Sequence, residues 1–157
     1  MAVWEEMDRS LRRYAPSPLA HDKSSELLHA LLSQGSAPTQ AAAARLAAGM
    51  LAHDEYRAML LRAELFDALL PPLKNGTAEV KLSLMSVIAS LTSLEAGRAQ
   101  LRLCGGIGNL LDVLLSSSST EDVQEATCQV LANLLEDQTD DWRQLLQNGA
   151  TFSLVAM

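Results

Sequence analysis

Chemistry-bearing side chains are few and dispersed along the 157-residue chain. The three histidines, His21, His29 and His53, have no cysteine or carboxylate at the spacing of a metal-ligand set. The run His53-Asp54-Glu55 comes nearest to a site, but its neighbours are typical of a helix end or a loop. Neither a Ser–His–Asp nor a Cys–His arrangement is indicated. We therefore expect a protein that is not an enzyme, with no catalytic residues, no metal and no cofactor.

Three further motifs have simple structural explanations. Gly105-Gly106-Ile107-Gly108 lacks the following Lys-Ser/Thr and the preceding strand of a phosphate-binding loop, so we expect its glycines to turn the chain. The run from Ser116 to Ser119 is expected to link two helices, with phosphorylation as an alternative role. Cys104 and Cys128 form neither a disulfide framework nor a zinc site, which indicates a reducing, intracellular compartment, cytoplasmic or nuclear.

The composition excludes several classes of protein. Hydrophobic residues make up 48% of the chain and charged residues 20%, which is too apolar for a disordered protein. Aromatic residues make up only 4%, so Leu, Ala and Val must fill the core, and this composition favours helices. The net charge of −7 opposes binding to nucleic acid or to an anionic membrane. No segment resembles a signal peptide or is long and apolar enough to span a bilayer.

Acidic residues are concentrated in one segment near the end of the chain. The segment contains no Lys or Arg, and its acids are Glu121, Asp122, Glu125, Glu136, Asp137, Asp140 and Asp141. A solvated outer face that keeps the protein soluble explains this pattern. A patch that attracts a basic partner is the alternative.

The chain repeats itself at intervals of about 42 residues. Leu101 has counterparts at Leu60 and Leu145, and Arg98 has one at Arg57. Apolar positions of a later helical segment, Val123, Thr127, Val130, Leu131 and Leu134, correspond to Val80, Leu84, Val87, Ile88 and Leu91. This spacing places the apolar side chains on one face of an α-helix.

Each of these helical segments is preceded by a threonine that can act as its N-cap. Thr77 and Thr120 occupy matching positions, where a hydroxyl can accept a hydrogen bond from a first-turn backbone N–H. Acidic residues follow each threonine, which is favourable at the start of a helix.

The chain resembles the armadillo repeat family, in which a short helix, a glycine-marked turn, a second helix and a longer third helix are repeated. The stretch from Arg98 to Asn133 carries the pattern best, with Cys104-Gly105-Gly106-Ile107 at the turn and Val130-Leu131-Ala132-Asn133-Leu134 near the end of the third helix. The resemblance implies an all-α fold, a right-handed α-solenoid of armadillo-like three-helix repeats in which each unit buries the apolar face of the next. Two-helix HEAT-like units are the architectural alternative.

The repeat divides the chain into two regions. Residues 1–25 form a partly flexible N-terminal leader, in which Trp4, Leu11 and Tyr14 suit a short amphipathic turn or two and Ala15-Pro16-Ser17-Pro18 is expected to break any helix. Residues 26–157 form the armadillo-like repeat domain, with about three units and a truncated fourth. We favour truncation of a longer chain as the reason for the incomplete last unit.

The first two units carry more specific predictions. In the first unit, Leu27, Leu28 and Leu31 predict a second helix, and Thr39 to Leu51 predict a third. In the second unit, Pro71-Pro72 predicts an early stop or a kink in the second helix.

The resemblance also implies a binding surface on the concave side formed by the third helices. There an asparagine of armadillo proteins hydrogen-bonds the backbone of an extended peptide. Only Asn133 matches, since Ser90 stands at the equivalent place of the second unit, and Gln129 and Ser86 replace the family's groove tryptophan. A helix-surface hydrogen bond is the alternative role for Asn133. The expected surface comprises Asn133, Gln129, Ser86, Ser90, Gln124 and Lys81.

These patterns predict a non-catalytic scaffold or adaptor. Its partner is expected to be another protein, presented as an extended or basic segment, and no nucleic acid or membrane. A regulator that holds a folded partner domain, such as a chaperone cofactor or exchange factor, is the alternative. An enzyme would require a cleft with clustered, perturbed carboxylates. The pattern does not specify the partner's identity or the oligomeric state.

Overall fold

The computed structural model describes residues 18–61 and 63–135. Within these residues the protein contains eight helices and no strand, so the predicted all-α class is confirmed. The helices are α2 (Pro18–Gln34), α3 (Ala37–Leu51), α4 (Asp54–Leu60), α5 (Ala63–Asn75), α6 (Ala78–Thr92), α7 (Glu95–Leu103), α8 (Gly106–Leu115) and α9 (Glu121–Leu135).

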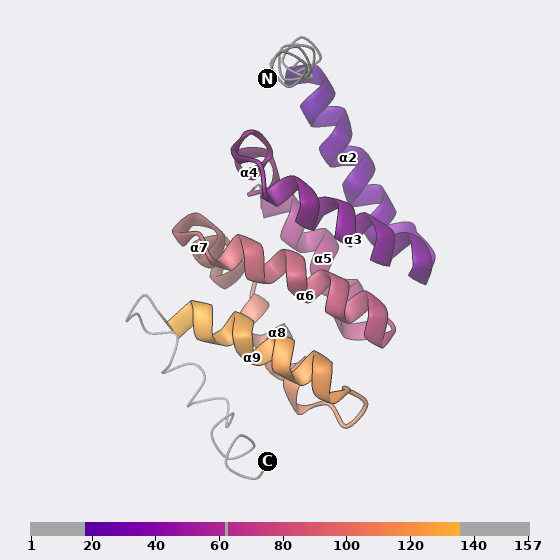
Figure 1. Cartoon of the computed structure of the whole chain (residues 1–157), viewed down its shortest axis with the longest axis vertical. Helices are drawn as coiled ribbons and strands as arrows, with labels where there is room; N and C mark the ends of the chain where they lie inside the picture. The colour runs from indigo at the N-terminus through magenta and orange to yellow at the C-terminus, as the bar shows by residue number, and fades with distance from the viewer. Residues whose placement is uncertain (1–17, 62, 136–157) are drawn as a thin grey trace, which may run out of the picture.

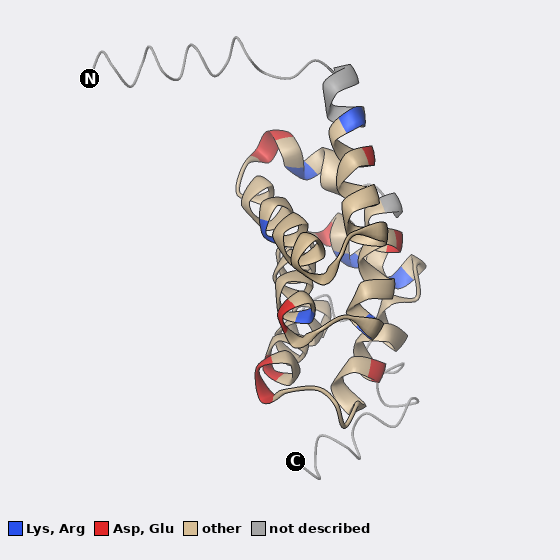
Figure 2. Ribbon diagram, turned by 90° about the vertical axis from the view of Figure 1, so that its right-hand side faces the viewer, with Lys and Arg blue, Asp and Glu red and all other residues tan. Residues whose placement is uncertain are grey.

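The helices form two layers. Helices α3, α6 and α9 lie side by side in one layer, and α2, α5 and α8 pack against one another in the same order in the second (Figure 1). The view turned by 90° shows the two layers edge-on (Figure 2). The short helices α4 and α7 connect the end of one first-layer helix to the next second-layer helix. Each helix of the first layer contains 15 residues.

The starts of the first-layer helices follow from their side chains. The Thr77 hydroxyl accepts a hydrogen bond from the Val80 N–H at 3.4 Å, and the Thr120 hydroxyl accepts one from the Val123 N–H at 3.4 Å. The two predicted N-caps are therefore confirmed. Ser36 takes the same place before α3, but its hydroxyl bonds the Thr39 hydroxyl at 2.9 Å.

The core runs through the whole stack as one cluster. All ten apolar positions predicted for the helices that became α6 and α9 are at most 5% exposed, which confirms that they share one buried face. Phe66 of α5 is the bulkiest fully buried side chain, and leucines fill most of the remaining space between the layers. Alanines Ala43, Ala44 and Ala47 take the equivalent role on α3.

Two loops match their predicted roles. Gly105 has φ of 69°, in the left-handed region that glycine adopts without steric cost, and it turns the chain from α7 into α8. A Cβ on Gly106 would lie 2.1 Å from Leu101 Cδ1, so this position also requires glycine. Ser116–Ser119 link α8 to α9, and the Ser119 hydroxyl donates to the Val113 carbonyl at 2.6 Å.

Helix α2 begins earlier than the sequence pattern indicated. It starts at Pro18, so residues 18–25, which were grouped with the leader, belong to the same helix as Glu26. Proline is tolerated here because the N–H that it lacks would have no intrahelical acceptor in the first turn. Residues 1–17, with the expected amphipathic turn, and residues 136–157, with the truncated fourth unit, lie outside the described residues.

Of the two outcomes expected at Pro71-Pro72, the early stop is wrong, because α5 continues through both prolines to Asn75, and the kink stays a prediction. Each proline removes one helical N–H donor. Leu69 and Leu73 on either side are fully buried, and this packing offsets the lost hydrogen bonds. The helix then closes through the Gly76 N–H, which donates to the Pro72 carbonyl at 2.7 Å.

Candidate functional site

The expected binding residues lie on two neighbouring helices of the first layer. Lys81, Ser86 and Ser90 belong to α6, and Gln124, Gln129 and Asn133 to α9. Equivalent positions of α3, α6 and α9 form two rows across the layer. The Ser86 row is Arg45, Ser86 and Gln129, and the Ser90 row is Gly49, Ser90 and Asn133. All three side chains of the Ser86 row are exposed, so this row offers the most accessible surface.

Asn133 connects α9 to α6. Its amide nitrogen donates to the Ala89 carbonyl at 3.2 Å and to the Thr92 hydroxyl at 3.3 Å. Its amide oxygen accepts from the Gln129 amide at 3.4 Å. The bond with Gln129 is the helix-surface hydrogen bond expected as the alternative role of Asn133, and the bonds to Ala89 and Thr92 add a role between helices that was not predicted. The peptide contact stays a prediction, and it requires these bonds to be exchanged.

Gln124 and Lys81 stand at equivalent positions near the starts of their helices and offer less to a partner. Gln124 donates to the Leu114 carbonyl at 3.4 Å, as the equivalent Gln40 does to the Leu32 carbonyl at 2.9 Å. These amides tie first-layer helices to the ends of second-layer helices. Lys81 is only 7% exposed, because its aliphatic stem packs within the protein.

Four of the described acidic residues lie near the beginnings of α6 and α9. Glu79, Glu121, Asp122 and Glu125 are exposed, and acids near a helix N-terminus are favoured by the helix dipole. Glu79 pairs with Arg45 of α3 at 3.0 Å across the layer. Figure 2 shows that acidic and basic residues are interspersed over the described helices. The acids from Glu136 to Asp141 lie outside the described residues.

Two arginines at equivalent positions of the repeat, Arg57 and Arg98, bind the ends of first-layer helices. Arg57 Nε donates to the Leu51 carbonyl at 2.9 Å, and Arg98 donates through a terminal guanidinium nitrogen to the Thr92 carbonyl at 2.9 Å. Leu51 and Thr92 are the last residues of α3 and α6. Each arginine therefore satisfies a carbonyl that has no partner within its own helix, and places a positive charge at the negative end of the helix dipole.

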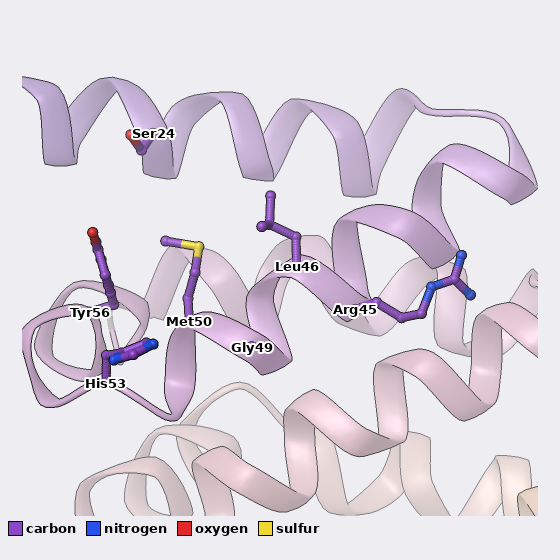
Figure 3. Close-up of a pocket in the computed structure, with 7 residues that line it drawn as sticks. All are labelled: Ser24, Arg45, Leu46, Gly49, Met50, His53 and Tyr56. Carbon is purple, nitrogen blue, oxygen red and sulfur yellow. The ribbon is translucent and has the colours of Figure 1, made fainter. Parts of the chain in front are cut away.

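A hollow of about 510 Å³ lies at one end of the stack, between α2, α3 and α4 (Figure 3). It is lined by Ser24, Arg45, Leu46, Gly49, Met50, His53 and Tyr56. The rings of His53 and Tyr56 meet edge to face, with centroids 6.3 Å apart. Leu46 is 58% exposed, which is unusual for a leucine on a helix that packs on two sides. The sequence pattern did not reveal this hollow.

The described residues contain no cluster of three or more His, Cys, Asp and Glu side chains that could hold a metal ion. His53 precedes α4 as its N-cap residue, and Asp54 pairs with Arg57 at 2.7 Å. Burial and, to a lesser extent, the nearby Asp67 carboxylate raise the pKa of the Cys104 thiol above its ordinary value. This thiol is therefore a weak nucleophile at neutral pH.

Comparisons with known proteins identify no family for this chain. No protein-family model matches the chain, and no curated protein has a significantly similar sequence. Among the described helices, none is by itself long and apolar enough to cross a membrane. Helices α6 and α7 meet the length and composition criteria only together, as a pair bent by 119°.

Proposed function

We propose that the chain is a right-handed α-solenoid of armadillo-like three-helix repeats, and that it acts as a non-catalytic scaffold or adaptor. It binds another protein on the face formed by α3, α6 and α9. One observation carries this proposal: three helices of 15 residues lie side by side with equivalent positions in register. Such a repeated surface suits a partner that meets each helix in the same way.

The Ser86 row supports an extended partner. Packed helices are separated by about 8–10 Å, and an extended chain advances about 3.3 Å per residue. A segment that crosses α9, α6 and α3 therefore meets one helix about every three residues. Side chains as short as Ser86 allow its backbone to approach the helices closely. Because the surface is preformed, only the partner loses conformational entropy on binding.

The acidic ends of α6 and α9 support a basic partner. Glu79, Glu121, Asp122 and Glu125 are exposed beside the rows, and the chain as a whole has a net charge of −7. Exposed charges are screened over about 8 Å at physiological ionic strength. Binding should therefore weaken as salt rises, and Lys- or Arg-containing extended peptides should bind better than neutral ones.

The test is a binding screen of the intact chain against a library of extended peptides, repeated with two serine variants. Ser86→Trp should lower the affinity of any selected peptide about tenfold or more, or about 1.4 kcal/mol. Ser117→Trp is the matched control, since Ser117 is also exposed but lies in the loop between α8 and α9. Equal affinities for the two variants would reject the α3–α6–α9 face. Binding of folded domains alone, with a change in their nucleotide release or activity, would indicate the regulator instead.

A further inference from the structure

The first layer has two open edges among the described helices. Helix α6 is packed between α3 and α9, whereas no described first-layer helix precedes α3 or follows α9 (Figure 1). The hollow lies at the open edge of α3. Leu46 of α3 is 58% exposed there, whereas Val87 of α6 and Val130 of α9, at the equivalent position, are both 0% exposed. The hollow is therefore the place where a preceding first-layer helix would cover α3.

The contacts between α6 and α9 define the side with which a first-layer helix covers the next one. The Thr127 hydroxyl of α9 lies 3.9 Å from Met85 Sδ of α6. The Asn133 amide of α9 bonds the Ala89 carbonyl and the Thr92 hydroxyl of α6. Met85, Ala89 and Thr92 are therefore the residues that α6 turns toward the following helix, and their spacing of four residues and then three places them on one face.

Helix α9 has the same side, but it is exposed. The residues of α9 at these three positions are Cys128, Ala132 and Leu135, which we call the α9 edge. Cys128 and Ala132 are exposed, and Leu135 is 43% exposed. On α6, by contrast, Met85 and Thr92 are at most 1% exposed. The α9 edge consists of small or apolar side chains without charge, so it is suited to packing against the mainly apolar lining of the hollow.

The charges of the two edges are complementary. Helix α9 carries Glu121, Asp122 and Glu125 and no Lys or Arg, whereas Arg45 is the only charged residue of α3. None of the seven residues that line the hollow is acidic (Figure 3). Arg45 pairs with Glu79 at 3.0 Å, but both side chains are more than half exposed, so Arg45 can attract a further carboxylate. An acidic helix that enters the hollow therefore meets a cation in its lining and no like charge.

We infer that the α9 edge of one copy of this chain binds in the hollow of a second copy, where α9 takes the place of the missing first-layer helix. The contact repeats between two copies the packing that joins α3 to α6 and α6 to α9 within one chain. Its two sides are different surfaces, so the copies associate head to tail and further copies can add at either end. The inference does not rest on the proposed function, because it concerns the edges of the first layer and not its exposed face.

Two variants of the full-length chain, each with one edge blocked, test this arrangement. Leu46→Glu places a charge in the hollow, and Ala132→Glu places one on the α9 edge. Both residues are exposed and glutamate is a good helix former, so both variants should fold, which circular dichroism checks. In sedimentation equilibrium, the average mass of the parent chain should rise above that of a monomer as protein concentration increases. Each variant alone should stay monomeric, and their equimolar mixture should form dimers, because one variant keeps the α9 edge and the other keeps the hollow.

The other outcomes contradict the inference. A parent chain that stays monomeric at every concentration would overturn it, and so would a mixture of the two variants that forms no dimer. Association of Ala132→Glu alone would assign the hollow to a symmetric contact and would also overturn it. Ser117→Glu is the matched control, since Ser117 is exposed in the loop between α8 and α9, and this variant should associate like the parent chain.

A cross-link locates the contact. Asn133 of α9 bonds Ala89 of α6, and the equivalent pair between two copies is Gly49 of one with Ala132 of the other. A Cβ on Gly49 would have nothing within 4 Å, so Gly49→Cys introduces no clash. With both native cysteines replaced by serine, a short bismaleimide should join Gly49→Cys chains to Ala132→Cys chains, and join Gly49→Cys chains to Ser117→Cys chains much less. Equal yields in the two mixtures would contradict the inference.

Discussion

The two repeated arginines allow a quantitative test of how the stack is held together. Arg98 and Arg57 make the same hydrogen bond, each to the last carbonyl of the preceding first-layer helix. Their surroundings differ: Arg98 is 8% exposed, whereas the side chain of Arg57 is 40% exposed and pairs with the exposed Asp54. Methionine keeps much of the aliphatic volume of arginine and removes the donor, so the pair of Met variants compares the loss of a buried hydrogen bond with the loss of a part-buried one.

The magnitudes follow from the environment of each carbonyl. A hydrogen bond to a charged group contributes about 1.5–3 kcal/mol, and a buried acceptor left without its partner adds to the loss. Thr92 is fully buried, so Arg98→Met should lower the free energy of unfolding by about 2–3 kcal/mol. The hydrogen bond from Arg57 to the Leu51 carbonyl is only part-buried, so water can replace the guanidinium there, and the exposed pair with Asp54 contributes about 0.3–0.5 kcal/mol. Arg57→Met should therefore cost about 1 kcal/mol.

Urea unfolding followed by circular dichroism measures both losses, provided that the two variants keep the m-value of the parent chain. Equal costs for Arg98→Met and Arg57→Met would refute the argument from burial. A cost below about 0.5 kcal/mol for Arg98→Met would show that the carbonyl at the end of α6 does not depend on this side chain.

Further predictions concern glycine and cysteine positions. Gly49→Ala should stabilise the protein by about 0.5–1 kcal/mol, because the added Cβ lies in a helix interior and meets nothing within 4 Å. Gly97→Ala should destabilise the protein by about 1–3 kcal/mol, because the added Cβ would lie 1.9 Å from the Leu91 carbonyl oxygen. Melting temperatures check both signs, and a stabilised Gly97→Ala would contradict the packing. Iodoacetamide should modify exposed Cys128 before Cys104, whose thiol is half-buried and has a pKa raised by burial and by Asp67. Asp67→Asn should lower the pKa of Cys104 and so speed the alkylation of this thiol at neutral pH. An unchanged alkylation rate, measured by mass spectrometry, would exclude the Asp67 carboxylate as a cause of the raised pKa.

The features that could be predicted from the sequence are those with local causes. Apolar spacing identified the buried faces of α6 and α9, and Thr77 and Thr120 identified their first turns, because each signal lies within a few residues of the element it specifies. The end of α5 was missed for the opposite reason. Whether a helix survives two prolines depends on what its neighbouring leucines bury, and those contacts come from other helices.

The Ser90 row shows why the binding side chains are harder to predict than the fold. Asn133 reaches α6 because its amide is long enough to bond the Ala89 carbonyl, 44 positions earlier in the chain. Ser90, at the same position of α6, is shorter and donates instead to the Ser86 carbonyl of its own helix at 3.0 Å. Gly49 on α3 has no side chain to offer. In the Ser86 row Arg45 pairs with Glu79 and Gln129 bonds Asn133, but all three side chains of that row are exposed, so a partner gains more from the Ser86 row. We therefore expect variants of Ser86 and Gln129 to change affinity, and variants of Asn133 to change mainly the stability of the contact between α6 and α9.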